Sequence, residues 1–167
     1  MQTKFSNGLV LAVSILVVVA TVAGCASSTT ADEESRISKD VASNENKVMV
    51  FQLPTCNCCE DYKDYLREQG FQVETTYTED MSSIRKQYQI PPSMESCHTM
   101  VIGDYFVEGH VPIEAIKKMI EEKPDIDGIA LAGMPAGSPG MAGEQTEAFK
   151  IYALVDGKTS EFMVINE

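Results

Sequence analysis

The sequence predicts an α/β domain in which strands and helices alternate, followed by a long irregular loop and a final β-hairpin. Two observations carry this prediction. Short apolar runs with period-two alternation are interleaved with segments whose apolar residues recur at helical spacing. Near the C-terminus, Asp156-Gly157 separates two β-rich runs, which is a strong turn signal. We therefore expect one domain over residues 47–167 of the 167-residue chain.

The expected elements run in the order strand, helix, strand, helix, hairpin and helix. Gly70 stops the first helix, Pro91-Pro92 prevents continuation of the second, and Pro112 occupies a favoured first position of the third. The expected ranges are a strand at 47–53, a helix at 58–69, a strand at 71–77, a helix at 80–88, a hairpin at 99–109 and a helix from 112 to 123.

This order is that of the minimal thioredoxin-like fold, and it has a geometric consequence. The first hairpin strand should lie antiparallel to the first strand, so that the start of one meets the end of the other. Cys97 and His98, just before Thr99, would then lie beside the cysteines at 56–59, and the second hairpin strand would bring His110 to the same edge.

The remaining C-terminal segment divides into a loop and a hairpin. Gly and Pro around Gly133-Met134-Pro135 and Gly140-Met141 exclude a regular element at the centre of 124–147. Two readings of this loop stay open: a plain surface loop, or a lid that brings Met134 and Met141 over the thiols. Residues 148–155 and 158–165 form the expected hairpin.

The N-terminus resembles a bacterial lipoprotein signal. Lys4 precedes an apolar run from Gly8 to Val22, and Val22-Ala23-Gly24-Cys25 resembles a lipobox with Cys25 as the lipidated first residue. We expect a signal peptide at 1–24, a flexible tether at 25–46 and an extracytoplasmic, lipid-anchored protein, on the periplasmic side if the cell is Gram-negative. The alternative is an uncleaved membrane anchor, for which the run is slightly short.

Charge and compartment narrow the classes of partner. The formal net charge of −12 argues against nucleic acid, which repels an acidic protein. Outside the cytoplasm disulfides persist, so the cysteines other than Cys25 could also form two disulfides, with Cys58 or Cys59 paired to Cys97.

Three cysteines within four positions, where a strand gives way to a helix, indicate a site for thiolate chemistry. Cys56 and Cys59 alone have the redox spacing C-x-x-C, but Cys58 would scramble a redox pair, whereas a soft metal would gain a ligand. Thioethers and imidazoles extend the donor set. The candidate metal ligands are Cys56, Cys58, Cys59, Cys97, His98, His110, Met134 and Met141.

Thiolate and thioether donors together select copper(I), while Cys and His alone would also suit zinc, which we rank lower because one zinc ion leaves donors unused. Thiolates bridge metals, so this many donors could hold a small cluster. The predicted cofactor is therefore copper(I).

The motifs also resemble a known family. C-x-C-C after a strand, Ser96-Cys97-His98-Thr99, Glu108 to Pro112, and Gly133 to Met141 are similar to the domain of unknown function 411, the family of CopG-like copper-resistance proteins. The resemblance spans residues 47–165. It implies copper binding, a role in copper handling outside the cytoplasm with other copper-handling proteins as partners, and ligation by Cys56, Cys58, Cys59, Cys97 and His110.

The preferred function is that of a copper-binding protein that is not itself an enzyme, although a change of copper oxidation state is compatible with the site. Two other functions stay open. One is a thiol-disulfide oxidoreductase that uses Cys56 and Cys59; it is opposed by Cys58 and by His98, which stands where thioredoxins place a cis-proline. The other is an interaction module in which disulfides staple the fold.

Overall fold

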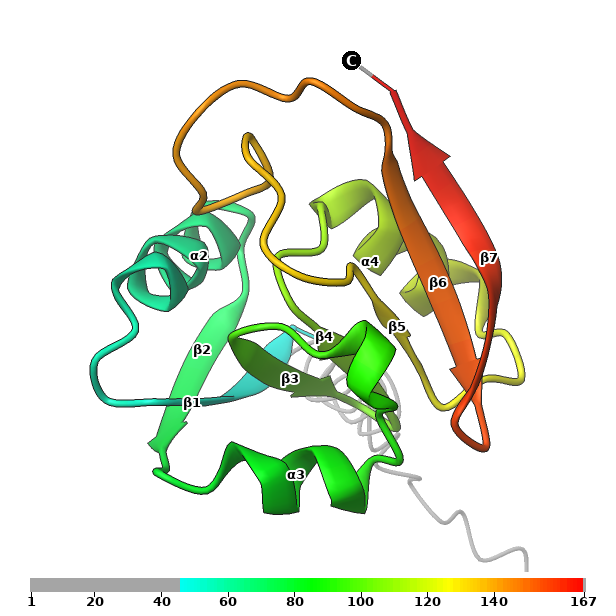
Figure 1. The fold of residues 1–167 in the computed structure, drawn as a ribbon, viewed down its shortest axis with the longest axis horizontal. Helices are drawn as coiled ribbons and strands as arrows, with labels where there is room; N and C mark the ends of the chain where they lie inside the picture. Colours follow the sequence, from blue (N-terminus) through cyan, green and yellow to red (C-terminus); the bar gives the residue numbers. More distant parts are fainter. Residues whose placement is uncertain (1–45, 167) are drawn as a thin grey trace, which may run out of the picture.

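A computed structural model describes residues 46–166, which form a single seven-stranded sheet flanked by three α-helices (Figure 1). The spatial strand order is β2-β1-β3-β4-β5-β6-β7. In chain order the elements are β1 (Lys47–Gln52), α2 (Asn57–Glu68), β2 (Gln72–Tyr77), α3 (Met81–Gln87), a 3₁₀ turn (Pro92–Met94), β3 (His98–Ile102), β4 (Tyr105–Glu108), α4 (Ile113–Glu122), β5 (Gly128–Ala130), β6 (Phe149–Val155) and β7 (Lys158–Ile165).

The pairing of the first four strands follows the predicted order of elements. β1 pairs parallel with β2 and antiparallel with β3, and β3 pairs antiparallel with β4. Gln52, the last residue of β1, lies opposite His98, the first residue of β3. The end of β1, which leads into the cysteine-rich stretch, is thereby placed beside the segment that carries Cys97.

The two faces of the sheet are covered by different helices. α2 and α4 lie on one face and α3 on the other (Figure 1). The larger core is built under α2 and α4 from residues such as Tyr62, Leu66 and Met119, while Phe106 and Leu154 belong to a smaller cluster with Ile90, just after α3. Adjacent Phe106 and Val107 face opposite clusters, because side chains alternate along a strand.

One strand lies in a segment that we expected to be irregular. β5 runs parallel to β4 and antiparallel to β6, so it joins the C-terminal hairpin to the sheet. Three residues are too few to show a period, and Gly128 reads in the sequence as a breaker. In the fold a Cβ at Gly128 would lie 2.3 Å from the Phe106 carbonyl oxygen, so only glycine permits this close approach.

The C-terminal hairpin confirms the predicted Asp-Gly turn. Asp156 and Gly157 both have positive φ, as the tight turn between two antiparallel strands requires. The hairpin of β3 and β4 is also present, but β4 ends at Glu108 rather than at Gly109, so His110 lies in the turn that leads to α4.

The predicted signal peptide at 1–24 and nearly all of the tether at 25–46, including Cys25, lie outside the described residues. Within residues 46–166, no helix has the length and apolar character needed to cross a membrane.

Candidate metal centre

The six predicted Cys and His ligands come together at one edge of the sheet. Cys56 is the residue before helix α2, and Cys58 and Cys59 lie in its first turn. Cys97 immediately precedes β3, His98 begins it, and His110 lies between β4 and α4. These positions are the ends of β1 and β4 and the start of β3, so the antiparallel pairing is what assembles residues far apart in sequence.

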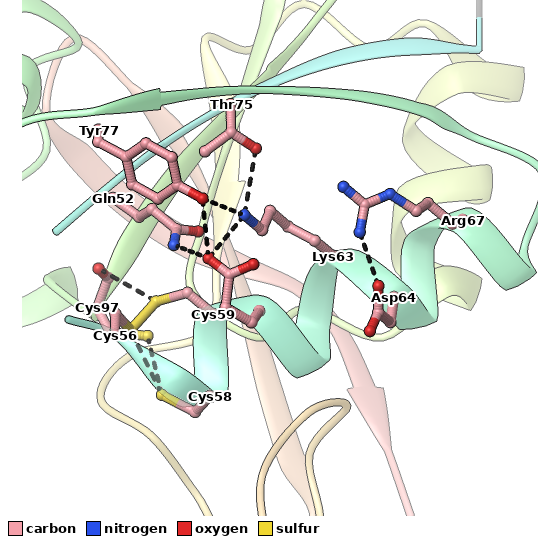
Figure 2. Close-up of polar contacts among 11 residues, drawn as sticks. Gln52, Cys56, Cys58, Cys59, Lys63, Asp64, Arg67, Thr75, Tyr77 and Cys97 are labelled. Atoms are coloured by element: carbon pink, nitrogen blue, oxygen red, sulfur yellow. Dashed lines mark hydrogen bonds and ion pairs between the residues drawn. A yellow bond between two sulfur atoms is a disulfide. The ribbon is translucent and has the colours of Figure 1, made fainter. Parts of the chain in front are cut away.

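Four sulfur atoms form the first part of the site (Figure 2). Cys56 and Cys59 are joined by a disulfide, and Cys58 and Cys97 are free thiols. The Cys58 Sγ lies 3.6 Å from the Cys56 Sγ and 3.8 Å from the Cys97 Sγ. Among the described cysteines, neither Cys58 nor Cys59 is paired with Cys97, so the expected alternative of two disulfides does not hold.

Cys97 also belongs to a second group of donors, with the two histidines. Its Sγ lies 2.9 Å from the His110 Nε2 and 3.4 Å from the His98 Nδ1. The ligand atoms of Cys97, His98 and His110 lie within 4.8 Å of one another, as do the four sulfurs of the first group. Cys97 is therefore shared between an all-sulfur set and a sulfur-nitrogen set.

The hydrogen bonds of His110 fix which of its nitrogens is free to bind. Nδ1 lies 2.7 Å from the Pro139 carbonyl oxygen, which can only accept, so Nδ1 carries the proton. Nε2 is then unprotonated in the neutral ring and accepts from the Cys97 thiol. This arrangement, with one nitrogen donating to a backbone carbonyl, is the usual one for a metal-binding histidine.

Burial keeps all three donors of the sulfur-nitrogen set neutral in the metal-free protein. Burial, and then the neighbouring Cys58, raises the pKa of the Cys97 thiol to about 12. Burial, and then the nearby His110, lowers the pKa of His98 to about 3, and burial also lowers the pKa of His110. The His98 Nε2 is buried and has no hydrogen-bond partner among the described residues. The site thus holds unprotonated imidazoles ready to bind a cation.

Tyr62 supports both imidazoles, a role that we did not predict from the sequence. Its ring centroid lies 4.6 Å from that of His98 and 5.2 Å from that of His110, and its hydroxyl donates to the Val111 carbonyl at 2.9 Å. Tyr62 follows Cys58 by four positions, which places both on one side of the helix. That spacing was the available signal.

The Gly-, Pro- and Met-rich loop packs onto the start of helix α2. A Cβ at Gly140 would lie 2.6 Å from the Tyr62 nitrogen and 3.0 Å from the Cys58 carbonyl oxygen, so the loop backbone touches the helix directly. Met141 follows this contact and is partly buried, whereas Met134 is 52% exposed. The loop therefore reaches the helix that carries the cysteines, but it leaves Met134 largely in solvent.

A polar network beside the disulfide was also missed. Lys63 is almost fully buried, and its ammonium donates to Glu60 at 2.8 Å and to Thr75 at 3.3 Å, while Gln52 donates to Glu60 at 2.7 Å (Figure 2). The hydrogen bond from Lys63 is the main cause of a lowered pKa at Glu60. The network ties the first turn of α2 to the ends of β1 and β2.

Comparison with known proteins identifies the class. The family described as "Protein of unknown function, DUF411" matches residues 94–141, which include Cys97, both histidines and the Met-containing loop. No curated protein matches the sequence. The chain belongs to the DUF411 family, as the following structural relatives show.

The relatives are two solved structures of the copper resistance protein CopG, Form 1 and Form 2. Each is 38% identical to this chain, with a TM-score of 0.67. Each match covers 72% of this chain and 98% of the CopG chain. The present protein is thus a homologue of CopG whose Cys/His cluster could hold a metal.

Proposed function

We propose that this chain is an extracytoplasmic copper(I)-binding protein of thioredoxin-like fold that acts in copper handling or resistance. The observation that carries the proposal is the pair of donor groups that share Cys97, four sulfurs on one side and two imidazoles on the other. The homology to a copper resistance protein supports copper as the metal. The order of the elements from β1 to α4 supports the thioredoxin-like assignment.

The chemistry of the donors favours copper(I) over zinc. Soft thiolates prefer copper(I), and a thiolate can bridge two ions. Cys97 is the natural bridge because it lies within reach of both groups. The proposed ligands are Cys56, Cys58, Cys59, Cys97 and His110. We also include His98, whose Nδ1 lies close to the Cys97 sulfur. Met134 and Met141 are proposed as further ligands from the loop.

Full loading requires reduction of the Cys56–Cys59 disulfide, because the metal ligand is the thiolate. An external dithiol would supply two electrons and two protons and leave two thiols, which lose their protons as copper(I) binds. The oxidised protein loses Cys56 and Cys59 as donors and keeps Cys58, Cys97, the two histidines and the loop methionines. We therefore expect it to bind fewer copper ions per chain than the reduced protein.

An anaerobic titration with copper(I) against a chromophoric copper(I) chelator tests this proposal. Fully reduced protein, freed of reductant, should bind tightly, the oxidised form should bind fewer ions, and Cys97→Ser should lower the affinity more than about tenfold because both groups lose a ligand. Circular dichroism checks that the variant folds. Equal affinity and stoichiometry in wild type and Cys97→Ser would contradict the proposal.

A thiol-disulfide oxidoreductase is the second candidate, favoured by the Cys56–Cys59 disulfide at the start of α2. The free Cys58 thiol, 3.6 Å from the Cys56 sulfur, opposes it, because it could attack a mixed disulfide. An insulin-reduction assay compares wild type with Cys58→Ser/His98→Pro. An oxidoreductase should turn over without metal and gain activity in the variant, whereas a copper site should lose copper and gain little.

A further inference from the structure

Glu108 has a fully buried carboxylate. This carboxylate contacts the residues that flank Cys97 and His98 in the chain. It ends β4, two residues before His110, and its side chain is 0% exposed. Burial raises the pKa of this carboxyl, whereas the hydrogen bonds from Thr99 and Ser96 and the charge of Arg85 act in the opposite direction and favour its ionised form. A buried carboxylate destabilises the fold unless it is hydrogen-bonded and paired with a positive charge.

The two carboxylate oxygens grip the Cys97–His98 dipeptide at both ends. Oε1 accepts from the Ser96 backbone N–H at 2.7 Å, on the residue before Cys97. Oε2 accepts from the Thr99 hydroxyl at 2.5 Å, on the residue after His98. One rigid side chain therefore fixes the segment on either side of two candidate ligands, and its own backbone leads to the third.

Arg85, from helix α3 on the opposite face of the sheet, completes this arrangement. Its Nε lies 3.3 Å from the Glu108 Oε1, and its Nη2 donates to the Ser96 carbonyl oxygen. Its Nη1 lies 3.4 Å from a carboxylate oxygen of Glu95, whose side chain is 41% exposed. Arg85 thus balances the charge of Glu108. It also binds the carbonyl of Ser96, the residue whose N–H donates to Glu108.

We propose that Glu108, with Arg85 as its counter-ion, is the positioning residue that sets Cys97 and His98 against His110. The role rests on the proposed copper(I) site, because it fixes the sulfur-nitrogen half of that site. The charge matters because the Arg85 guanidinium and the Ser96 N–H can only donate, and the Thr99 hydroxyl also donates here. Glu108→Gln removes the negative charge that pairs with Arg85, and its NH2 group must face Thr99, whose hydroxyl then has to accept instead of donate.

Glu95→Gln is the matched control, because it removes the same charge from the same arginine without touching Ser96 N–H or Thr99. The first readout is amide hydrogen exchange in the reduced, metal-free full-length protein. The probes are Ser96, which donates to Glu108, and Gly109, which donates to the His98 carbonyl at 3.0 Å. Val50 in the centre of β1 reports global opening.

We expect exchange at Ser96 and Gly109 to rise about tenfold in Glu108→Gln with Val50 unchanged, and the copper(I) affinity to fall by about 10- to 100-fold. Glu95→Gln should stay within about twofold of wild type in both measurements. If Val50 also exchanges faster, Thr99→Val, which removes only the Oε2 contact, replaces Glu108→Gln with the same expected directions.

The inference is overturned if Glu108→Gln matches Glu95→Gln in exchange, or if local exchange rises while copper(I) affinity stays that of wild type. Failure of the proposed function has a different signature, because wild type itself would then not bind copper(I). The exchange measurement needs no metal and would still show whether Glu108 fixes the segment.

Discussion

His98 has the most strongly altered environment of the candidate ligands. It is fully buried, its ring packs at a tilt against that of Tyr62, and its pKa is lowered to about 3 from an ordinary value of 6.5. Between these values the unfolded chain takes up a proton at His98 and the folded chain does not. The contribution of His98 to the free energy of unfolding is therefore fully present above pH 6.5 and is lost as the pH is lowered toward 3.

We predict that metal-free wild-type protein loses about 2 to 3 kcal/mol of unfolding free energy through His98 when the pH falls from 6.5 to 4.5. Urea unfolding at both pH values measures it. His98→Gln should lose this part of the pH dependence and keep the smaller part due to His110, whose pKa is lowered in the same direction. An unchanged pH dependence in His98→Gln would show that His98 is not held neutral by the fold.

The loop at 131–147 depends on one close contact with helix α2. Gly140 has φ +77° and touches the backbone at Tyr62, one residue after the Pro139 carbonyl that fixes the His110 tautomer. Gly133 in the same loop has φ +69°, with nothing within 4 Å of an added Cβ. A substitution at either glycine would strain the backbone, because both have positive φ. Only at Gly140 would the added Cβ also clash with helix α2.

Gly140→Ala should therefore cost more than Gly133→Ala. For either variant the left-handed backbone costs about 1 kcal/mol, and the clash at Gly140 adds about 1 to 3 kcal/mol or lifts the loop off the helix. Urea unfolding and the copper(I) competition titration separate these effects. We expect a weaker copper(I) affinity in Gly140→Ala alone; equal effects in the two variants would mean that the contact with α2 does not matter for the site.

We expect this chain to join an acidic domain, which carries the candidate metal centre, to a lipid anchor. With a net charge of −12, the chain is repelled by an anionic lipid surface. Attachment would therefore depend on the acyl chains at Cys25 and not on the domain. The predicted tether at 25–46 would separate the two.

Intact mass spectrometry of membrane-extracted protein tests the anchor. The expected mass lacks residues 1–24 and carries lipid on Cys25, and Cys25→Ala should abolish membrane attachment while copper(I) binding by the domain is kept. A mature N-terminus at Met1, or a water-soluble form with unmodified Cys25, would contradict it.

The sequence by itself determined most of the fold and the inventory of donors. Period-two and helical spacings, with Gly70, Pro91-Pro92 and Asp156-Gly157 as boundaries, are local signals. They predicted nine of the eleven described elements in outline, all except the 3₁₀ turn and β5. The convergence of Cys97, His98 and His110 on the cysteine-rich stretch also followed from element order, because antiparallel pairing fixes which strand ends meet.

Only the tertiary structure decided how those donors are held. The Cys56–Cys59 disulfide, the support of both imidazoles by Tyr62 and the grip of Glu108 on Ser96 and Thr99 depend on distances across strands and helices. β5 likewise exists through its neighbours β4 and β6. Such contacts leave no periodic trace in the sequence, since each depends on which residues the folded sheet brings opposite one another.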